Sequence, residues 1–188
     1  MCGIVGYIGN KKAVPVLING LLSLEYRGYD SAGIAILENE EILVMKDKGR
    51  VANLQNIEGI QDFTSSIGIA HTRWATHGKP SKENAHPHMD NSEQFAVVHN
   101  GIIENYMKLK EMLIRNGVSF LSVTDTEVIV QLIEYYYSGD LLEATMKAVD
   151  RLEGSYALGI MSVDEPGKLI AVRKESPLIV AYGKGANY

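Results

Sequence analysis

The chain has 188 residues, 46% of them hydrophobic and 22% charged, a composition typical of one soluble globular domain. Its formal net charge of −5 and its scattered lysines and arginines exclude the basic surface that nucleic-acid binding requires. No apolar run reaches the roughly 18 residues of a membrane span, and the N-terminus lacks a signal-peptide pattern. We therefore expect a cytoplasmic protein with no nucleic-acid or membrane partner, and the single cysteine fits a reducing compartment.

That cysteine is the second residue, and it precedes a glycine and an apolar run, Ile4 to Ile8, which predicts a short buried strand. Removal of Met1 would leave a thiol and a free α-amine on Cys2. The α-amine titrates near pH ~7.7–8.0, so it suits a thiol that needs a base at neutral pH. The alternative is that Met1 stays and Cys2 is a small buried hydrophobic residue.

The first half of the chain is expected to contain mainly strands. Asn10 can cap a helix whose apolar residues recur on one face. The predicted elements are a helix over residues 10–23, strands over 34–37 and 42–45 joined by a turn at Asn39-Glu40, a weak helix over 51–57 and a strand over 66–71.

A polar loop, Glu25 to Gly33, links the first helix to the hairpin. Its glycines, Gly28 and Gly33, are interpreted as turn residues. Arg27 and Asp30 form a charged pair between two apolar elements, so they will be partly buried and will need partners.

The strand over residues 66–71 runs into His71-Thr72-Arg73-Trp74-Ala75-Thr76-His77-Gly78. Such a density of side-chain donors at a strand end is typical of a small-molecule site. The five histidines, at positions 71, 77, 86, 88 and 99, also raise the hypothesis of a metal site. No cysteine pair or carboxylate stands at ligand spacing from them, so we predict no metal.

A predicted strand over residues 94–98 runs into His99-Asn100-Gly101. The Asn-Gly dipeptide alone favours a tight turn. The other interpretation is an oxyanion hole, in which an amide side chain and an unobstructed glycine N–H stabilise a tetrahedral intermediate. Thr124 and Asp125 have the character of a helix cap, which is compatible with ligand binding.

Three helices and three strands are predicted in the rest of the chain: helices over residues 105–116, 128–137 and 141–152, and strands over 156–162, 169–173 and 178–181. In the third helix we expect Met146, Ala148 and Val149 to face inward. Strands that cluster early and late, with helices between them, indicate an α+β layered domain and not a βαβ repeat.

Four stretches occur together and in a characteristic order. They are Met1-Cys2-Gly3-Ile4, Tyr26-Arg27-Gly28-Tyr29-Asp30-Ser31-Ala32-Gly33, the stretch from His71 to Gly78, and His99-Asn100-Gly101 with Thr124-Asp125. Together they resemble the glutaminase domain of the glutamine–fructose-6-phosphate aminotransferase family. That family belongs to the class II glutamine amidotransferases, which are N-terminal-nucleophile hydrolases. The resemblance covers nearly the whole chain.

The resemblance implies an α+β fold, a four-layered αββα sandwich with two antiparallel sheets, and no cofactor. It implies that Cys2, freed of Met1, attacks the side-chain amide of L-glutamine and forms a thioester. Hydrolysis of the thioester then yields glutamate, after release of ammonia. The resemblance also implies that Asn100 and the Gly101 N–H form the oxyanion hole. Arg73 would bind the α-carboxylate of the substrate, and Asp125 would bind its α-ammonium. Trp74, Thr76 and His77 would line and close the pocket, and Arg27 and Asp30 would support the nucleophile.

The family also implies a longer protein. Residues 2–188 would then form a glutaminase domain truncated at its C-terminal end, with two sugar-phosphate isomerase domains absent. Fructose 6-phosphate would bind only through those absent domains, and we expect the full-length enzyme to be a homodimer.

Related families are weaker matches. Amidophosphoribosyltransferases share the terminal cysteine, but the forms of residues 26–30 and 72–77 favour the aminotransferase, and asparagine synthetases fit less well in both stretches. An N-terminal-nucleophile hydrolase acting on another amide is disfavoured because the pair Arg73 and Asp125 suits an α-amino acid.

Overall fold

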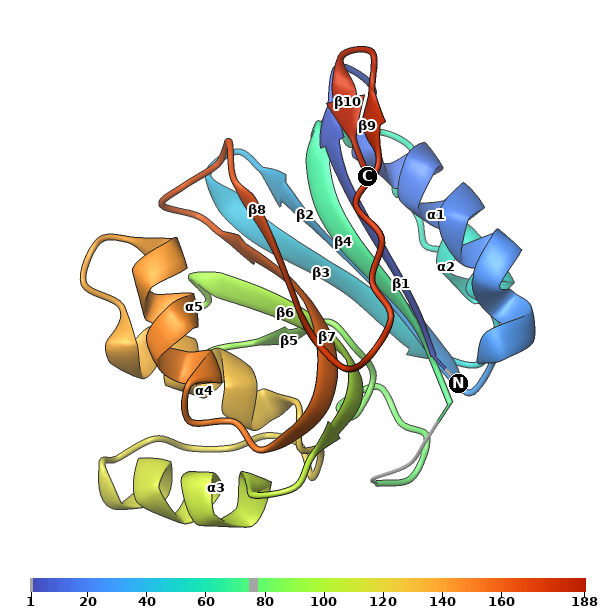
Figure 1. The fold of residues 1–188 in the computed structure, drawn as a ribbon. Coiled ribbons are helices and arrows are strands. Elements are labelled where there is room, and N and C mark those ends of the chain that lie inside the picture. The colour runs from blue at the N-terminus through green and yellow to red at the C-terminus, as the bar shows by residue number, and fades with distance from the viewer. Residues whose placement is uncertain (1, 75–77) are drawn as a thin grey trace.

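The computed structural model describes residues 2–74 and 78–188 and consists of two antiparallel sheets packed between two layers of helices (Figure 1). The sheets have the strand orders β3-β2-β4-β1-β10-β9 and β5-β6-β7-β8. The strands are β1 (Gly3–Gly9), β2 (Ser31–Glu38), β3 (Glu41–Lys48), β4 (Ile67–Arg73), β5 (His88–Met89), β6 (Phe95–Ile103), β7 (Gly154–Ser162), β8 (Leu169–Lys174), β9 (Tyr182–Gly183) and β10 (Ala186–Asn187). The helices are α1 (Ala13–Leu24), α2 (Val51–Gln55), α3 (Tyr106–Arg115), α4 (Glu127–Tyr136) and α5 (Leu141–Val149), with a 3₁₀ turn, η1 (Glu25–Arg27).

Side-chain alternation along the strands produces three apolar layers. In β2, Ile34 and Ile36 point to the outer face and pack with α1 and α2, whereas Ala35 points between the sheets. Helices α3, α4 and α5 cover the outer face of the four-stranded sheet, against residues such as Leu158 and Ile160. The architecture is therefore the expected four-layered αββα sandwich. No helix in residues 2–74 and 78–188 has both the length and the hydrophobicity to cross a bilayer.

The expected turn at Asn100-Gly101 is wrong, because β6 continues through both residues to Ile103. Asn100 pairs with Ala157 of β7, and Gly101 pairs with Tyr156. Gly101 has a φ of 132°, and a Cβ at this position would lie 2.0 Å from the carbonyl oxygen of Ser155. Glycine is therefore required by the close approach of β7 and by a backbone conformation that other residues rarely adopt.

The predicted strand over residues 178–181 is also wrong. Its residues are largely solvent-exposed, with Ile179 at 85%, and backbone pairing begins only at Ala181, which exchanges two hydrogen bonds of 2.9 Å with Tyr188 just before β9. The chain reverses at Gly185, with φ 74°, and β10 then pairs with β1 through Asn187 and Ala186. The apolar, branched composition of residues 178–181 indicated a strand, but the turn places the residues that follow them against β1.

In α5 the predicted inward face is shifted. The buried positions are Leu141, Ala144, Thr145 and Ala148, which follow helical spacing. Met146 falls outside that stripe and is 59% exposed, whereas Val149 is partly buried against the core as expected.

Candidate active site

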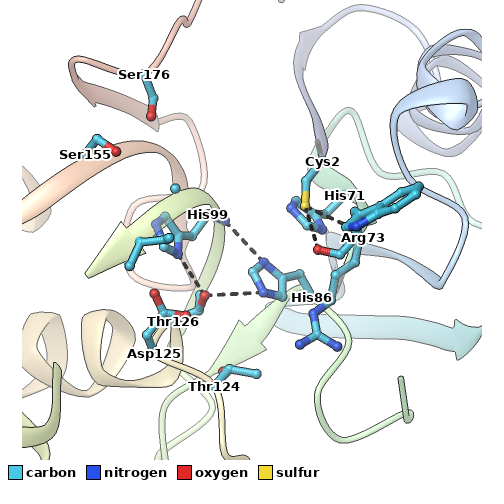
Figure 2. Close-up of a pocket in the computed structure, with 13 residues that line it drawn as sticks. Cys2, His71, Arg73, His86, His99, Thr124, Asp125, Thr126, Ser155 and Ser176 are labelled. Carbon is cyan, nitrogen blue, oxygen red and sulfur yellow. Dashed lines mark hydrogen bonds between the residues drawn. The ribbon is translucent and has the colours of Figure 1, made fainter. Parts of the chain in front are cut away.

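A cavity of about 360 Å³ lies between the ends of the two sheets, a size suited to a small molecule. In Figure 2, Cys2, His71 and Arg73 lie on one side of it, and Asp125 and Thr126 lie on the other. Its wall consists of Cys2, His71, Arg73, Trp74, His86, His99, Gly101, Ile102, Thr124, Asp125, Thr126, Ser155 and Ser176.

The sulfur of Cys2 contacts the backbone of Trp74. Pairing of β1 with β4 sets Gly3 opposite Thr72, so Cys2 lies beside the end of β4. The Trp74 N–H donates to Cys2 Sγ at 3.1 Å, and the Cys2 thiol is 3.5 Å from the Trp74 carbonyl oxygen. Burial raises the pKa of the Cys2 thiol, although the Trp74 N–H and the charge of Arg73 oppose this effect. The thiol is therefore protonated at neutral pH and needs a base before it can attack.

The loop between η1 and β2 supports the peptide that contacts the sulfur. Gly28 is extended, with φ −168°, and a Cβ there would lie 2.8 Å from the Arg73 carbonyl carbon and 3.0 Å from the Trp74 nitrogen. The Asp30 N–H donates to the Arg73 carbonyl oxygen at 3.0 Å. The Tyr29 ring also packs edge-on against Trp74, with centroids 5.5 Å apart.

The interpretation of Gly33 as a turn residue is wrong, and that of Gly28 is incomplete, because the Gly28 N–H does close the η1 turn on the Glu25 carbonyl oxygen at 3.1 Å. Gly28 has an ordinary extended backbone, and its role is to let the 73–74 peptide approach closely. Gly33 lies inside β2, where a Cβ would come within 2.1 Å of the His86 carbonyl oxygen. Both positions exclude a side chain for reasons of tertiary packing, which a sequence pattern does not reveal.

Opposite charges reach the same cavity through Arg73 and Asp125. Arg73 is 4% exposed, and its Nη2 donates to the Gly78 carbonyl oxygen at 3.4 Å. Burial lowers the pKa of Arg73, but the charges of Cys2, Asp30 and Asp125 oppose that, and a guanidinium remains protonated in proteins. Asp125 is also 4% exposed, and its Oδ2 accepts the Ile103 N–H at 2.9 Å. This pair can bind a zwitterion.

Asn100 adjoins the backbone of the cysteine. Its Nδ2 donates to the Cys2 carbonyl oxygen at 3.2 Å, and its Oδ1 lies 2.9 Å from His71 Nε2. The next residue, Gly101, lines the cavity. The pair that the sequence left open between a turn and an oxyanion hole thus occupies a strand next to the candidate nucleophile.

The structure brings most of the predicted site residues together. Cys2, Arg73, Trp74, Gly101 and Asp125 line the cavity. Among the residues described, Arg27, Asp30 and Asn100 are not part of the cavity wall. Asp30 and Asn100 nevertheless form hydrogen bonds with wall residues, Asp30 with Arg73 and Asn100 with Cys2. The predicted Thr76 and His77 lie outside the described residues.

Sequence reasoning missed the structural role of four buried histidines, His71, His86, His88 and His99. The rings of His71 and His86 stack with centroids 4.1 Å apart, and His88 and His99 flank His86 at 4.9 and 6.5 Å. Within the described ranges, no group of three or more His, Cys, Asp or Glu residues is arranged to hold a metal ion. Ser155 and Ser176 also line the cavity, and no sequence signal marks either one.

A family model described as a glutamine amidotransferase domain matches residues 71–188, more than half of the chain. The chain belongs to this glutamine amidotransferase domain family. It is 58% identical over its whole length to a glutamine–fructose-6-phosphate aminotransferase (isomerizing) of Caldanaerobacter subterraneus subsp. tengcongensis, and it covers 31% of that protein. It is 54% identical to the protein of the same name from Aquifex aeolicus, and it covers 32% of that one. The chain thus spans about a third of the length of these relatives.

Solved structures support the fold of this glutamine amidotransferase domain. A glutamine phosphoribosylpyrophosphate amidotransferase from B. subtilis, complexed with ADP and GMP, aligns with a TM-score of 0.86 and 27% identity. The alignment covers 100% of this chain and 41% of that one. The expected fold of the N-terminal-nucleophile type is therefore confirmed. The higher identities to the aminotransferases agree with the preference that the sequence motifs indicated.

We expect Gly28→Ala to slow the reaction of Cys2 with a thiol reagent. The added methyl group would displace the 73–74 peptide, weaken the Trp74 N–H bond to Sγ and so raise the pKa of the thiol further. The measurement is the alkylation rate by iodoacetamide between pH 7 and 9. Gly167→Ala is the matched control, because a Cβ there meets nothing within 4 Å. Equal rates in both variants would contradict the role assigned to Gly28.

The buried histidines predict a loss of stability in mild acid. Burial lowers the pKa of His71 to about 3 and lowers the pKa values of His86 and His88 well below the usual 6.5. In the unfolded chain each would titrate near ~6.5, so protons favour unfolding as the pH falls below that value. Three such histidines lower the free energy of unfolding by about 4 kcal/mol per pH unit once all are charged in the unfolded chain.

Urea unfolding at pH 7, 6, 5.5 and 5 measures this slope above the range where carboxylates titrate. His88→Gln keeps a group that can bond to the Thr124 hydroxyl, which lies 3.1 Å from His88 Nε2, but it removes one titration. We expect its slope to be smaller by about 1.4 kcal/mol per pH unit. An unchanged slope would mean that His88 is not buried in its neutral form.

Proposed function

We propose that this glutamine amidotransferase domain hydrolyses L-glutamine to glutamate and ammonia through a thioester on Cys2. One observation carries the proposal: the Cys2 sulfur, the Arg73 guanidinium and the Asp125 carboxylate all face one cavity. A nucleophile placed with a cation and an anion fits a substrate that has an amide at one end and an α-amino acid group at the other.

The proposed reaction begins when the α-amine of Cys2, freed by removal of Met1, takes the proton of the thiol. The thiolate attacks the amide carbon, and the resulting oxyanion receives hydrogen bonds from Asn100 Nδ2 and the Gly101 N–H. The α-ammonium returns the proton to the leaving nitrogen as the C–N bond breaks, and ammonia departs. Water then attacks the thioester with the same amine as base, which yields glutamate and the free thiol.

The remaining roles concern binding and support. Arg73 binds the α-carboxylate in a bidentate pair, and Asp125 binds the α-ammonium with the carboxylate that Ile103 anchors. Trp74, Thr76 and His77 are proposed to line and close the pocket. Arg27 and Asp30 are proposed to support the nucleophile, and for Asp30 the hydrogen bond to the Arg73 carbonyl oxygen provides the route.

The names of the relatives extend the proposal to a larger protein. Because they are glutamine–fructose-6-phosphate aminotransferases about three times as long as this chain, residues 2–188 are proposed to be the glutaminase part of such an enzyme. The ammonia would convert fructose 6-phosphate to glucosamine 6-phosphate in isomerase domains outside these residues. We also propose that the full-length enzyme is a homodimer and that it is cytoplasmic.

We expect Cys2→Ala to abolish release of ammonia from glutamine, because no other thiol is available. A form with one residue retained before Cys2, verified by intact mass, should lose about 10²–10⁴-fold in kcat, since its α-amine no longer belongs to the cysteine. The matched control is the same preparation processed so that Cys2 comes first. A full rate in the unprocessed form would show that another group is the base.

We expect the two charges to discriminate among derivatives of the substrate. Arg73→Gln should lower kcat/KM for glutamine about ten- to a hundredfold, the loss of a charge-assisted contact of about 1.5–3 kcal/mol, but should change it little for glutamine α-amide. Asp125→Asn keeps an acceptor for the Ile103 N–H, so it should show the same loss for glutamine and little change for N-acetylglutamine. Equal losses on every substrate would argue against these assignments.

A further inference from the structure

We infer that His71 is a positioning residue: its Nε2–H holds the Asn100 side-chain amide with its nitrogen turned toward Cys2. The inference rests on the proposed function, in which Asn100 donates to the oxyanion. It adds a residue of the cavity wall that acts through Asn100, by helping to determine which atom of the Asn100 amide faces Cys2.

The directions of the hydrogen bonds follow from the Cys2 carbonyl group. A carbonyl oxygen can only accept, so the Asn100 atom 3.2 Å from it is the amide nitrogen. The other end of the amide, Oδ1, then faces His71 Nε2 at 2.9 Å and can only accept. His71 Nε2 must therefore carry the proton. The acceptor-only Cys2 oxygen thus identifies both the orientation of Asn100 and the tautomer of His71.

The environment of His71 keeps this tautomer. His71 is 0% exposed, and burial lowers its pKa to about 3 despite the bond to Asn100, so the ring is neutral at physiological pH. A neutral imidazole carries one N–H, and here Nε2 has it, so Nδ1 is deprotonated. In the described residues, Nδ1 is buried and makes no hydrogen bond of good geometry, although a backbone contact with His99 opposes the fall of the His71 pKa.

The His71 ring is also fixed in its plane. It stacks on His86 with centroids 4.1 Å apart and an interplanar angle of 18°. His86 Nδ1 accepts the backbone N–H of His99 at 3.3 Å, so the His86 proton lies on Nε2, which is 3.3 Å from the Thr126 hydroxyl. The hydroxyl in turn lies 2.9 Å from His99 Nδ1.

The loop that carries His86 is held from the other side. Lys46 Nζ donates to the carbonyl oxygens of Ala85 and Pro87 at 2.7 and 2.9 Å. The His86 carbonyl packs against Gly33, where there is no room for a side chain. Since β4 pairs His71 with Gly33 of β2, the stacked rings are tied to the sheet at both ends.

The consequence for the reaction concerns the two hydrogens of Asn100 Nδ2. One is used on the Cys2 carbonyl oxygen, and the second is left for the oxyanion. If the amide turned by 180°, Oδ1 would face both the Cys2 carbonyl and the developing negative charge, and the donor would be lost. The amide has similar shape in both orientations, so packing alone does not choose between them. The Cys2 carbonyl oxygen and the N–H of His71 make the choice together, one as an acceptor for Nδ2 and the other as a donor to Oδ1.

Two substitutions separate the effect of losing the hydrogen-bond donor from the effect of changing the side-chain volume. His71→Gln places an amide N–H2 near the position of Nε2, and His71→Met fills the space with no donor. We expect His71→Met to lower kcat for glutamine by about 10- to 100-fold with little change in KM, because the contact matters in the transition state. His71→Gln should restore most of the activity. If Gln and Met are equally impaired, the donor is not what matters and the inference is wrong.

A double-mutant cycle with Asn100→Ala separates this inference from the proposed function. If His71 acts through Asn100, His71→Met has no further effect on kcat in the Asn100→Ala background. If His71→Met lowers kcat by the same factor in both backgrounds, the inference fails although glutamine hydrolysis stands. If Asn100→Ala alone leaves kcat unchanged, the oxyanion role in the proposed function fails instead.

A measurement on the unsubstituted protein covers the case in which His71→Met does not fold. The ¹⁵N shifts of the His71 ring report its tautomer directly. We expect the neutral form protonated on Nε2 throughout pH 6–8. A neutral ring protonated on Nδ1 would place an acceptor against Asn100 and overturn the inference.

Discussion

Strand β1 pairs with β4 from Gly3 opposite Thr72 to Ile8 opposite Ile67, and the rest of the site depends on this pairing. It ties down a chain end that would otherwise fray and sets the Cys2 sulfur against the Trp74 N–H. The same strand, β4, carries His71 toward the space between the sheets and Arg73 into the cavity wall. A shift of one residue in this register would exchange the two faces of β1 and move the sulfur out of the cavity.

Several polar groups around the cavity are buried with defined hydrogen-bond partners. Asp125 accepts a backbone N–H, burial lowers the pKa values of His71, His86 and His88, and Asn100 is bonded at both ends of its amide. Burying a charged group such as the Arg73 guanidinium costs free energy unless it is paired or hydrogen-bonded, and its Nη2 donates to the Gly78 carbonyl oxygen.

The sequence predicted the elements whose signal is local. Periodicity located α1, α4 and most strands, and the left-handed φ values of 52° and 64° at Asn39 and Glu40 match the predicted hairpin turn. The predictions failed where tertiary contacts determine the local structure. Asn100-Gly101 has the composition of a turn but pairs with β7, and Gly28 is interpreted from the sequence only as a turn residue, whereas the 73–74 peptide packs on it. The family motifs pointed to Cys2, Arg73 and Asp125, which line one cavity in the structure. They did not indicate that His71 and His86 would stack, because residues 71 and 86 meet only in the folded sandwich.

The site is divided between the two sheets, which links its geometry to the packing of residues remote from it. Cys2, His71 and Arg73 belong to the six-stranded sheet or its edge, whereas Asn100 and Gly101 belong to β6 of the other. The Asn100–Cys2 contact therefore bridges the two sheets. The layer between the sheets is closely packed where Gly159 faces it, because a Cβ at Gly159 would lie 3.0 Å from Val98 Cγ2 and 3.5 Å from Ile69 Cγ2. Since close-packed interiors transmit changes of volume, an added methyl group in this layer would be expected to lengthen the contact between Asn100 and the Cys2 carbonyl oxygen without touching either residue.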